Sequence, residues 1–509
     1  MLLLFRRVTW CQRVQLKQCI RSSHVTVAPR VRFAPSPTGY LHLGGLRTAL
    51  INYLFSRKHG GNFLLRIEDT DRSRLVPDAV DVLLEDLDWL GLKPDENPVV
   101  QSQRLEVYQR EVQRLVELGF AYPCFCSQAR LAALRREQSR SRHAVKGYDN
   151  HCRELTEEER DEKLKNKSEF TIRFKLDPSG ISGFQDMIYG QVNYDVAGHE
   201  GDPIILKSDG FPTYHLANVV DDHDSQITHV LRGIEWQIST TKHLQIYKAF
   251  NWEPPKYGHL PVLLTTGRTK LSKRDGDMSI RALREQGYFP EVLINHVLQW
   301  QEPIPRTLPR LIQEFSLGDL NRNNSQLQKE RMLLMNRSWI AEIFREDHQR
   351  LVQLVRRAVG DRATDWSDES ILKMMSWALP RLTTLEDLHH SEGFRFLWGT
   401  SEVCSEDVKD IGAIQLLSDC LDPVDFPSLP TYENCDKEAK HFIDLLKTRT
   451  DNSHVKCLKA FRKVLTGLSK GPSVSELFGI LGKVEIQRRL ADKLCELEKG
   501  DVERPITAV

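Results

Sequence analysis

A histidine and two glycines stand directly before an amphipathic segment near the start of the chain. The stretch 32–61 reads RFAPSPTGYLHLGGLRTALINYLFSRKHGG and places His42, Gly44 and Gly45 between an apolar run and a helical repeat of leucines. A helix N-terminus attracts phosphate, glycines let a ligand approach the backbone, and a histidine can donate to a phosphoryl oxygen. The pattern indicates a phosphate site, although a loop histidine beside a glycine turn would look the same.

A second group of basic residues lies much further along the chain. The stretch 265–277 reads TTGRTKLSKRDGD, so Lys270, Lys273 and Arg274 share a polar loop flanked by glycines. Lysine carries a compact charge that suits phosphate. Alone, this run reads equally well as a solvated charge cluster. Together and in this order, the two stretches are far more specific than either one.

Three cysteines are grouped in the sequence. Cys124 and Cys126 form a Cys-x-Cys pair, and Cys152 follows with His151 before it and Glu154 two residues after it. Structural zinc requires four ligands, and adjacent residues such as His151 and Cys152 rarely point at one metal. We therefore expect free thiols here and no zinc. The other cysteines are scattered, which does not indicate a disulfide framework.

Strands and a helix must position the first motif. The sequence reads as a strand from Val31 to Pro35, then a helix across the leucines of 43–58, then a buried strand in NFLLRIEDTD at 62–71. Another amphipathic helix begins near Asp78. Strand–helix–strand units have parallel strands, a right-handed crossover and a ligand site beyond the carboxyl ends of the strands.

The composition and the predicted secondary structure change twice in the rest of the chain. Residues 108–205 hold the grouped cysteines and a very polar stretch, and strand-like runs follow them. From about residue 280 the pattern is almost entirely helical. We expect an α/β protein: a Rossmann-type domain interrupted by an insertion and followed by an all-α C-terminal region.

Composition limits the classes of function. The 509 residues are 40% hydrophobic and 28% charged with a formal net charge of +1, so an RNA-binding face must be a local basic patch. The length suggests three or four domains. No apolar run approaches the roughly eighteen residues of a membrane span, so we expect no membrane partner.

The first thirty residues form a leader of different composition. They include Arg6, Arg7 and Arg13 among apolar residues, and the first carboxylate of the chain is Glu68. An arginine-rich, acid-free leader is typical of a mitochondrial transit peptide, which predicts a location in the mitochondrial matrix. The alternatives are a disordered basic tail or a secretory signal, and Arg6 and Arg7 interrupt the apolar run that a secretory signal needs.

The two motifs together resemble the signature motifs of class I aminoacyl-tRNA synthetases. His42-Leu43-Gly44-Gly45 stands where that family has His-Ile-Gly-His, and Lys270–Arg274 stands where it has Lys-Met-Ser-Lys-Ser. Gly45 departs from the general pattern, but the glutamate-specific branch commonly has glycine there. The flanking RFAPSPTGYLHLGG and LLRIEDTDRSR resemble bacterial-type glutamyl-tRNA synthetases, and the resemblance extends to about residue 345. Glutamine-specific relatives read Pro-Pro-Glu-Pro where this chain has Ala34 to Pro37.

The resemblance implies a role for each matching residue. It implies that His42, Lys270 and Lys273 are catalytic, that Arg232 binds the γ-carboxylate of glutamate, and that Glu68 holds the α-ammonium group. The alternatives are a surface ion pair for Arg232 and a salt bridge of Glu68 with Arg66 or Arg72. The implied ATP-binding residues are His42, Gly44, Gly45, Glu235, Lys270, Leu271, Ser272, Lys273 and Arg274. The implied glutamate-binding residues are Arg32, Phe33, Ala34, Ser36, Glu68, Tyr214, His215, Leu216, Ala217, Asn218 and Arg232.

The resemblance also implies the reaction and the partners. ATP is a substrate with Mg²⁺, glutamate is activated as the adenylate once tRNA is bound, and the terminal 2′-hydroxyl of the tRNA accepts it. A mitochondrial enzyme of this kind would charge tRNA(Glu) and also tRNA(Gln), with an amidotransferase correcting the second product. Family analogy favours a monomer. The alternatives are an enzyme restricted to tRNA(Glu), a glutamine-specific synthetase, a truncated relative that glutamylates a modified base, and a non-catalytic RNA-binding protein.

The implied roles complete the expected domain division. The segments are a transit peptide at 1–30, the first catalytic half at 31–107, an acceptor-binding insertion at 108–205, the second catalytic half at 206–265, a signature loop and stem-contact domain at 266–345, and a helical anticodon-binding domain at 346–509.

Overall fold

The structure is a computed structural model that describes most of the chain. The described residues are 28–140, 147–166, 169–264, 278–363, 366–398, 408, 410–427, 435–450 and 453–502. They divide into two compact units, each described by itself: the first comprises Met1–Leu283, Leu293–Trp300 and Arg306–Gln328, and the second comprises Arg284–Val292, Gln301–Pro305 and Lys329–Val509. The finer division into six segments stays a prediction. Residues 1–27 of the expected leader and the second motif at 265–277 lie outside the described residues.

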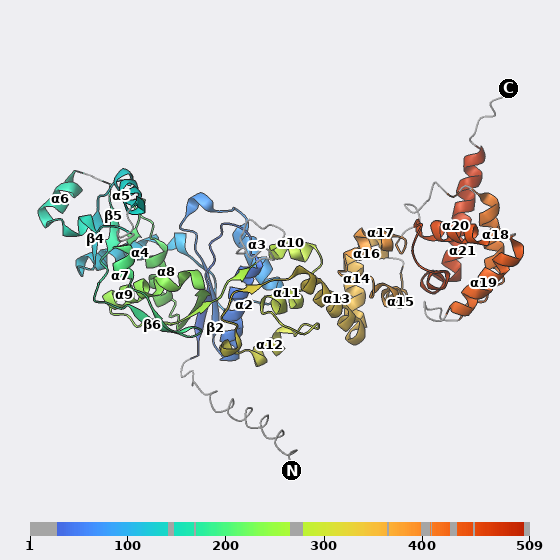
Figure 1. Cartoon of the computed structure of the whole chain (residues 1–509), viewed down its shortest axis with the longest axis horizontal. Coiled ribbons are helices and arrows are strands. Elements are labelled where there is room, and N and C mark those ends of the chain that lie inside the picture. Colours follow the sequence, from blue (N-terminus) through green and yellow to red (C-terminus); the bar gives the residue numbers. More distant parts are fainter. Residues whose placement is uncertain are drawn as a thin grey trace, which may run out of the picture. The chain divides into compact units, whose positions relative to one another are not determined.

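Two small sheets and the helices around them form the part of the first unit that the sequence analysis expects to be catalytic, which is called the catalytic part below (Figure 1). One sheet has the order β1-β2-β3, and all its strands are parallel. The other has the order β7-β6-β10-β9, in which β10 pairs in parallel with both β6 and β9. The backbone N–H of Thr228 donates to the carbonyl of Arg30 at 2.9 Å and connects the two sheets. The strands are β1 (Arg30–Phe33), β2 (Asn62–Ile67), β3 (Val99–Val100), β6 (Gly183–Asp186), β7 (Gly190–Asn193), β9 (His229–Gly233) and β10 (Lys256–Leu260).

The helix α2 (Leu43–Lys58) connects β1 to β2 and confirms the predicted strand–helix–strand unit. Its Leu46, Leu50 and Leu54 are completely buried, as the helical repeat of leucines predicts. The helix ends with two basic residues, which suit the negative end of the helix dipole, and Gly60 just beyond it has a φ of 66°. The predicted helix after Asp78 is also present, as α3 (Ala79–Trp89).

The insertion has an antiparallel sheet of its own, with the strand order β4-β5-β8. These strands are β4 (Ala121–Cys124), β5 (Thr171–Phe174) and β8 (Ile204–Leu206). A buried cluster that includes Tyr108, Phe174, Leu216 and Tyr247 joins this sheet to the helices of the catalytic part. Of the helices here, α4 (Leu105–Glu117) leads into the insertion, α5 (Gln128–Arg140), α6 (Glu157–Lys165) and α7 (Val196–Glu200) lie within it, and α8 (Tyr214–Asp224) and α9 (Thr240–Phe250) follow it in the chain.

A short parallel pair completes the strands of the first unit, and the remaining helices follow it in the chain. The pair is β11 (Leu263–Leu264) and β12 (Ser325–Gln326). The helices are α10 (Ile280–Glu285), α11 (Pro290–Val297) and α12 (Leu308–Glu314), of which α10 and α11 lie where the chain passes between the units. Within the described residues, no helix combines the length and the apolar character that crossing a bilayer requires.

The second unit is almost entirely helical, as the sequence predicts (orange and red in Figure 1). Phe442, Phe461 and Phe478 pack against one another in its core with ring centroids 5.1 to 6.2 Å apart. Gly482 interrupts the last helix with a φ of 74°. The helices are α13 (Lys329–Glu346), α14 (His348–Val359), α15 (Asp368–Ala378), α16 (Asp387–His390), α17 (Glu392–Arg395), α18 (Ile411–Leu421), α19 (Asp436–Arg449), α20 (His454–Thr466) and α21 (Val474–Val502).

Candidate active site

His42 caps the helix that it precedes. Its ring Nδ1 accepts hydrogen bonds from the backbone N–H groups of Gly44 at 3.0 Å and Gly45 at 3.2 Å. A ring nitrogen that accepts two hydrogen bonds carries no proton, so the neutral imidazole holds its proton on Nε2. The cap therefore fixes the tautomer and leaves Nε2 as the donor of the ring.

The two glycines make room for side chains of the chain itself. A Cβ at Gly44 would lie 2.9 Å from Cε1 of His42, and a Cβ at Gly45 would lie 2.8 Å from Cδ1 of Leu41. The phosphate site expected at this helix start stays a prediction. The structure adds that the N–H groups of both glycines are capped by His42.

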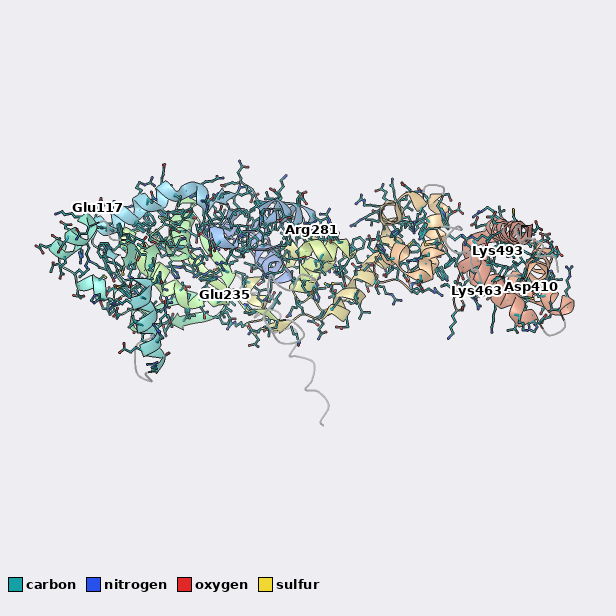
Figure 2. All side chains as sticks on the ribbon, turned by 90° about the horizontal axis from the view of Figure 1, so that it is seen from above. Glu117, Glu235, Arg281, Asp410, Lys463 and Lys493 are labelled. Carbon is teal, nitrogen blue, oxygen red and sulfur yellow. The ribbon has the colours of Figure 1, made fainter. Side chains whose placement is uncertain are left out.

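A cavity of about 560 Å³ opens beside this cap. Glu235 (Figure 2) lies in the 3₁₀ turn that follows β9, and it also lines this cavity. Buried Arg47, one turn along α2, donates from Nη1 to the carbonyl of Pro261 at 2.6 Å, and burial lowers its pKa to about 10, so it stays charged at neutral pH. Other predicted site residues that line this cavity are Phe33, Ala34, Ser36, His42, Gly44, Gly45 and Glu68. The remaining predicted ATP-binding residues, Lys270, Leu271, Ser272, Lys273 and Arg274, lie outside the described residues.

Arg232 lies near the end of β9 and uses all five of its N–H donors on neutral groups. Nε donates to Nε2 of His259 at 3.1 Å, and Nη2 donates to Oγ1 of Thr240 at 2.9 Å and to the Trp236 carbonyl at 3.2 Å. Nη1 donates to Oη of Tyr214 and to Nδ1 of His243, both at 3.2 Å. The side chain is 5% exposed, and no carboxylate in the described part of the chain lies within ion-pair distance of it.

Two further buried arginines of this region, Arg32 and Arg66, are neutralised by carboxylates. Arg32 donates to both carboxylate oxygens of Asp222, at 2.9 and 3.2 Å, and Arg66 donates to the same carboxylate at 2.5 Å. Arg66 also pairs with Glu68 at 3.1 Å, so the salt bridge considered for Glu68 is present. Burial raises the pKa of Glu68, and the charge of Arg66 opposes that rise. The Asn218 amide lies against both guanidinium groups, and its oxygen accepts from them when the amide is turned to face that oxygen toward the arginines.

The predicted amino-acid pocket thus separates into different environments. Tyr214 and His215 line a second and larger cavity. Leu216 and Ala217 are completely buried in the hydrophobic core, and Asn218 is completely buried beside the arginines. The geometry therefore places Tyr214 beside Arg232 at the wall of the larger cavity and assigns Leu216 and Ala217 to packing.

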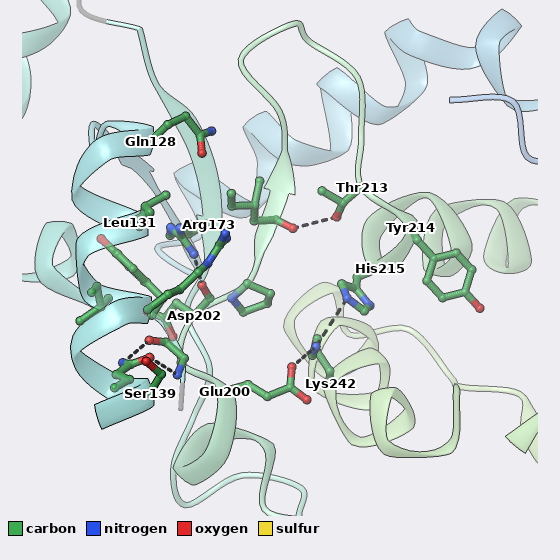
Figure 3. Close-up of a pocket in the computed structure, with 18 of the residues that line it drawn as sticks. Gln128, Leu131, Ser139, Arg173, Glu200, Asp202, Thr213, Tyr214, His215 and Lys242 are labelled. Carbon is green, nitrogen blue, oxygen red and sulfur yellow. Dashed lines mark hydrogen bonds and ion pairs between the residues drawn. The ribbon is translucent and has the colours of Figure 1, made fainter. Parts of the chain in front are cut away.

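The larger cavity, of about 1170 Å³, lies between the insertion and the catalytic part (Figure 3). Figure 3 shows Glu200 of α7 and Lys242 of α9 pointing toward each other across it, and their charged groups are 2.5 Å apart. Nε2 of His215 lies 3.5 Å from Nζ of Lys242. Arg173 covers the insertion side, where its guanidinium carbon lies 3.6 Å from the centre of the Tyr148 ring. The wall thus combines cationic and aromatic groups, which suits a nucleotide chain.

The grouped cysteines converge at one end of the insertion. The sulfur atoms of Cys124, Cys126 and Cys152 all lie within 4.8 Å of one another. Oη of Tyr148 lies 3.3 Å from Sγ of Cys124 and 3.5 Å from Sγ of Cys126. The hydrogen bond from Cys152 lowers the pKa of the Cys124 thiol. His151 is exposed and is not one of the converging groups, so three thiols and the neutral phenol of Tyr148 meet at this place.

The sequence analysis did not predict several buried residues that surround Arg232 and Arg66. Asp222, Thr240, His243 and His259 hold the arginines by direct hydrogen bonds. His259 gave the one available signal, because it stands at the end of an apolar strand, where ligand sites of parallel sheets occur. Asp222 lies in α8, within a stretch that the sequence analysis took as strand-like and that the structure shows to be a helix, and Thr240 and His243 lie in α9.

Comparison with known proteins agrees with this geometry. Residues 28–307 match the family described as "tRNA synthetases class I (E and Q), catalytic domain". The glutamate–tRNA ligase of Finegoldia magna is 34% identical over 485 residues, which cover 91% of this chain and 98% of that protein. The glutamate–tRNA ligase of Borreliella burgdorferi is 44% identical over 334 residues, which cover 63% of this chain and 68% of that protein.

A solved structure extends the likeness over most of the fold. The crystal structure of a glutamate tRNA ligase from Elizabethkingia meningosepticum, in complex with its amino acid, matches with a TM-score of 0.76 at 30% identity. The match covers 92% of this chain and 100% of that structure, and so includes the helical C-terminal region. The chain therefore belongs to the class I aminoacyl-tRNA synthetases, as a member of the glutamate–tRNA ligases.

Proposed function

We propose that this chain joins L-glutamate to tRNA(Glu) through a glutamyl-adenylate. The observation that carries the proposal is the state of Arg232, a buried guanidinium with only neutral partners beside two buried arginines that have carboxylate partners. A buried charge without a counter-ion is costly, so the site favours an anionic ligand. The Oη of Tyr214 accepts from Arg232 and keeps its own proton for a ligand oxygen. A γ-carboxylate satisfies both groups, whereas the neutral amide of glutamine leaves the charge uncompensated.

The proposed reaction takes place beside the helix cap that His42 forms. The α-carboxylate of glutamate attacks the α-phosphorus of ATP, and pyrophosphate leaves. Nε2 of His42 donates a hydrogen bond to the phosphates, and Arg47, Lys270 and Lys273 supply positive charge. ATP enters as its Mg²⁺ complex, which is a substrate. The terminal 2′-hydroxyl of the tRNA then attacks the carbonyl of the mixed anhydride, and AMP leaves, so no side-chain nucleophile is required.

The larger cavity is the place that we propose for the acceptor end of the tRNA. Arg135, Arg136 and Arg140 on α5 are exposed at its insertion side, and Arg135 lines the cavity itself. Single-stranded nucleic acid binds where cationic groups follow the backbone and aromatic rings can stack on bases. Tyr148, Tyr214 and Trp236 supply such rings.

The C-terminal helices are proposed to contact the anticodon region. On α20, Lys456 and Lys459 are exposed, whereas the basic run of α21 is largely neutralised inside the unit. Arg488 pairs with Glu485 at 2.7 Å, and Lys493 (Figure 2) is 5% exposed and pairs with Glu496 at 2.8 Å. Phosphate contacts are therefore expected from α20 and not from the α21 run.

We further propose that the chain acts in the mitochondrial matrix as a monomer and charges tRNA(Gln) as well as tRNA(Glu). The arginine-rich leader supports the location. The bacterial-type sequence supports the wider tRNA range, because organelles without a glutaminyl enzyme need glutamate on both tRNAs. An amidotransferase would then convert glutamyl-tRNA(Gln).

Charging assays test the proposal directly. Purified protein is incubated with ATP, Mg²⁺, labelled glutamate and each mitochondrial tRNA in turn, with Arg232→Leu as the inactive control. Glutamate on both tRNAs supports the full proposal. Glutamate on tRNA(Glu) alone restricts it to a discriminating enzyme. Charging of neither tRNA contradicts it and favours a non-catalytic RNA-binding protein.

A further inference from the structure

Three neighbouring strands bring Asp186, His259 and Arg232 into one line. The middle strand β10 carries His259, which stands directly opposite Arg232 of β9 in the parallel register. On its other side, β10 pairs with β6, which ends at Asp186. All three residues therefore lie at the carboxyl ends of parallel strands, where ligands of such sheets bind.

A histidine connects the carboxylate to the guanidinium. Nδ1 of His259 lies 2.5 Å from Oδ2 of Asp186, and its Nε2 lies 3.1 Å from Nε of Arg232. Arg232 can only donate, so Nε2 of His259 accepts and carries no proton. The proton of the neutral ring is therefore on Nδ1 and is donated to Asp186. Burial lowers the pKa of His259, which keeps the ring neutral, although the bond to Asp186 acts in the opposite direction.

The two oxygens of Asp186 have different tasks. Oδ1 accepts only from backbone N–H groups: those of Ile188 at 2.8 Å and Tyr189 at 2.9 Å in a turn, and that of His259 at 3.4 Å. Oδ2 is used on His259. Burial alone would raise the pKa of Asp186, but these hydrogen bonds outweigh burial and lower it, so the group is a carboxylate.

The arrangement holds Arg232 in place without giving it a direct ion-pair partner. A carboxylate in direct contact would form an ion pair and compete with a ligand, as Asp222 pairs with Arg32 and Arg66. Here the carboxylate stands one imidazole away, and every group that the guanidinium contacts is neutral. The ring of His259 takes Nε, while Nη1 and Nη2 donate to Tyr214 and to the carbonyl of Trp236, two residues that line the larger cavity.

We propose that Asp186 and His259 are positioning residues for the selection of glutamate: they fix Arg232 by its Nε and keep its charge for the γ-carboxylate. This inference rests on the proposed function, because it assigns glutamate to Arg232. It predicts that glutamate binding depends on which atoms donate and which accept in the hydrogen bonds from Asp186 through His259 to Arg232, and not only on the presence of these side chains.

Asp186→Asn tests this order with little change of shape. The amide can keep its oxygen on the turn, but it turns an N–H toward Nδ1 of His259, so the ring proton moves to Nε2 and faces the N–H of Arg232. We expect the KM for glutamate to rise at least about tenfold, because a buried charged hydrogen bond is lost, while the KM for ATP stays within about twofold. The measurement is tRNA-dependent exchange of pyrophosphate into ATP, with the unfolding temperature recorded in parallel.

Asp177→Asn is the matched control. Asp177 accepts from the backbone N–H of Ser179 at 3.0 Å in a similar turn, but it is exposed and no histidine is bonded to it. The control variant should keep both KM values. An Asp186→Asn variant whose KM for glutamate equals that of wild type overturns the inference, as does one in which both KM values and the unfolding temperature change together.

A pair of His259 variants keeps the inference testable if Asp186→Asn does not fold. A glutamine at 259 can offer an oxygen to Arg232 and an N–H to Asp186, whereas a leucine offers neither. We expect His259→Gln to stay within about threefold of wild type in the KM for glutamate and His259→Leu to lose at least about tenfold. Equal effects of the two variants would contradict the inference. Absence of charging by the wild-type protein would instead contradict the proposed function, so the two failures are distinguishable.

Discussion

Nδ1 of His42 accepts the backbone N–H of Gly44 at 3.0 Å, so the first motif residue is also the cap of its own helix. The same contact sets the ring tautomer and presents Nε2 as the donor. Stability and chemistry therefore depend on different nitrogen atoms of one ring, and they can be separated by substitution.

His42→Asn separates the two roles. Asparagine is a good N-cap residue, so we expect the unfolding temperature to remain near that of wild type. Its short side chain cannot also reach the phosphates, so adenylate formation should fall about a hundredfold, as it does when one donor to a developing charge is removed. Pyrophosphate exchange and thermal unfolding measure the two effects. A His42→Asn variant with wild-type exchange would contradict the role of Nε2.

Gly44→Ala should disturb the cap by adding a methyl group against the ring of His42. The added methyl carbon would lie 2.9 and 3.0 Å from Cε1 and Nδ1 of His42, so the ring must move. We expect a loss of roughly 1–3 kcal/mol in the free energy of unfolding, as in other overpacked sites, and a lower exchange rate. Gly318→Ala is the control, because its new methyl would meet only Oγ of Ser316 at 3.6 Å. Equal behaviour of the two variants would contradict a close contact at Gly44.

The sequence predicted the parts of this molecule that depend on local pattern. The leucine repeat of α2, the parallel pairing of its flanking strands and the helical C-terminal region are all present. The hydrogen-bond partners of Arg232 were not predictable, because His259, Thr240 and His243 come from different elements whose pairing is set by tertiary structure. The capping of Gly44 and Gly45 also escaped prediction, since the pattern does not show which way the His42 ring turns.

The pH dependence of stability should reflect buried histidines. Burial lowers the pKa of His229 to about 4, and it lowers the pKa of completely buried His243 well below its usual value. An unfolded histidine titrates near 6.5, so below that pH the unfolded chain binds more protons than the folded one and stability falls as pH falls. Each residue contributes a loss of up to about 1.4 kcal/mol per pH unit between the two pKa values.

Urea denaturation at several pH values between about 7.5 and 5 measures this slope. His229→Gln removes one of the buried imidazoles and should make the slope shallower. His199→Gln removes an exposed imidazole and is the control. A slope that is the same in both variants would show that His229 does not stay neutral in the folded chain.

The expectation of free thiols in the insertion can be tested by metal analysis. Three sulfur atoms lie within 4.8 Å of one another, which is one ligand short of the four that structural zinc uses, and the neutral phenol of Tyr148 beside them is not one of its usual ligands. We expect protein supplied with zinc to retain well below one equivalent per chain, measured by mass spectrometry of metals after dialysis. Cys126→Ser, which alters the cluster, and Cys495→Ser, which alters an exposed cysteine, should both have the zinc content of wild type. A full equivalent of zinc that is lost in Cys126→Ser alone would contradict the expectation.

The central claim is that the uncompensated charge of Arg232 selects glutamate, and steady-state charging by Arg232→Leu tests it most directly. The account predicts that kcat/KM for glutamate falls at least about a hundredfold, while the KM for ATP and the unfolding temperature remain close to those of wild type. Arg57→Leu, which removes a guanidinium paired with Asp95 on the outer part of α2, should keep wild-type charging. If Arg232→Leu charges tRNA(Glu) as efficiently as the wild-type protein, the assignment of the γ-carboxylate to Arg232 is wrong.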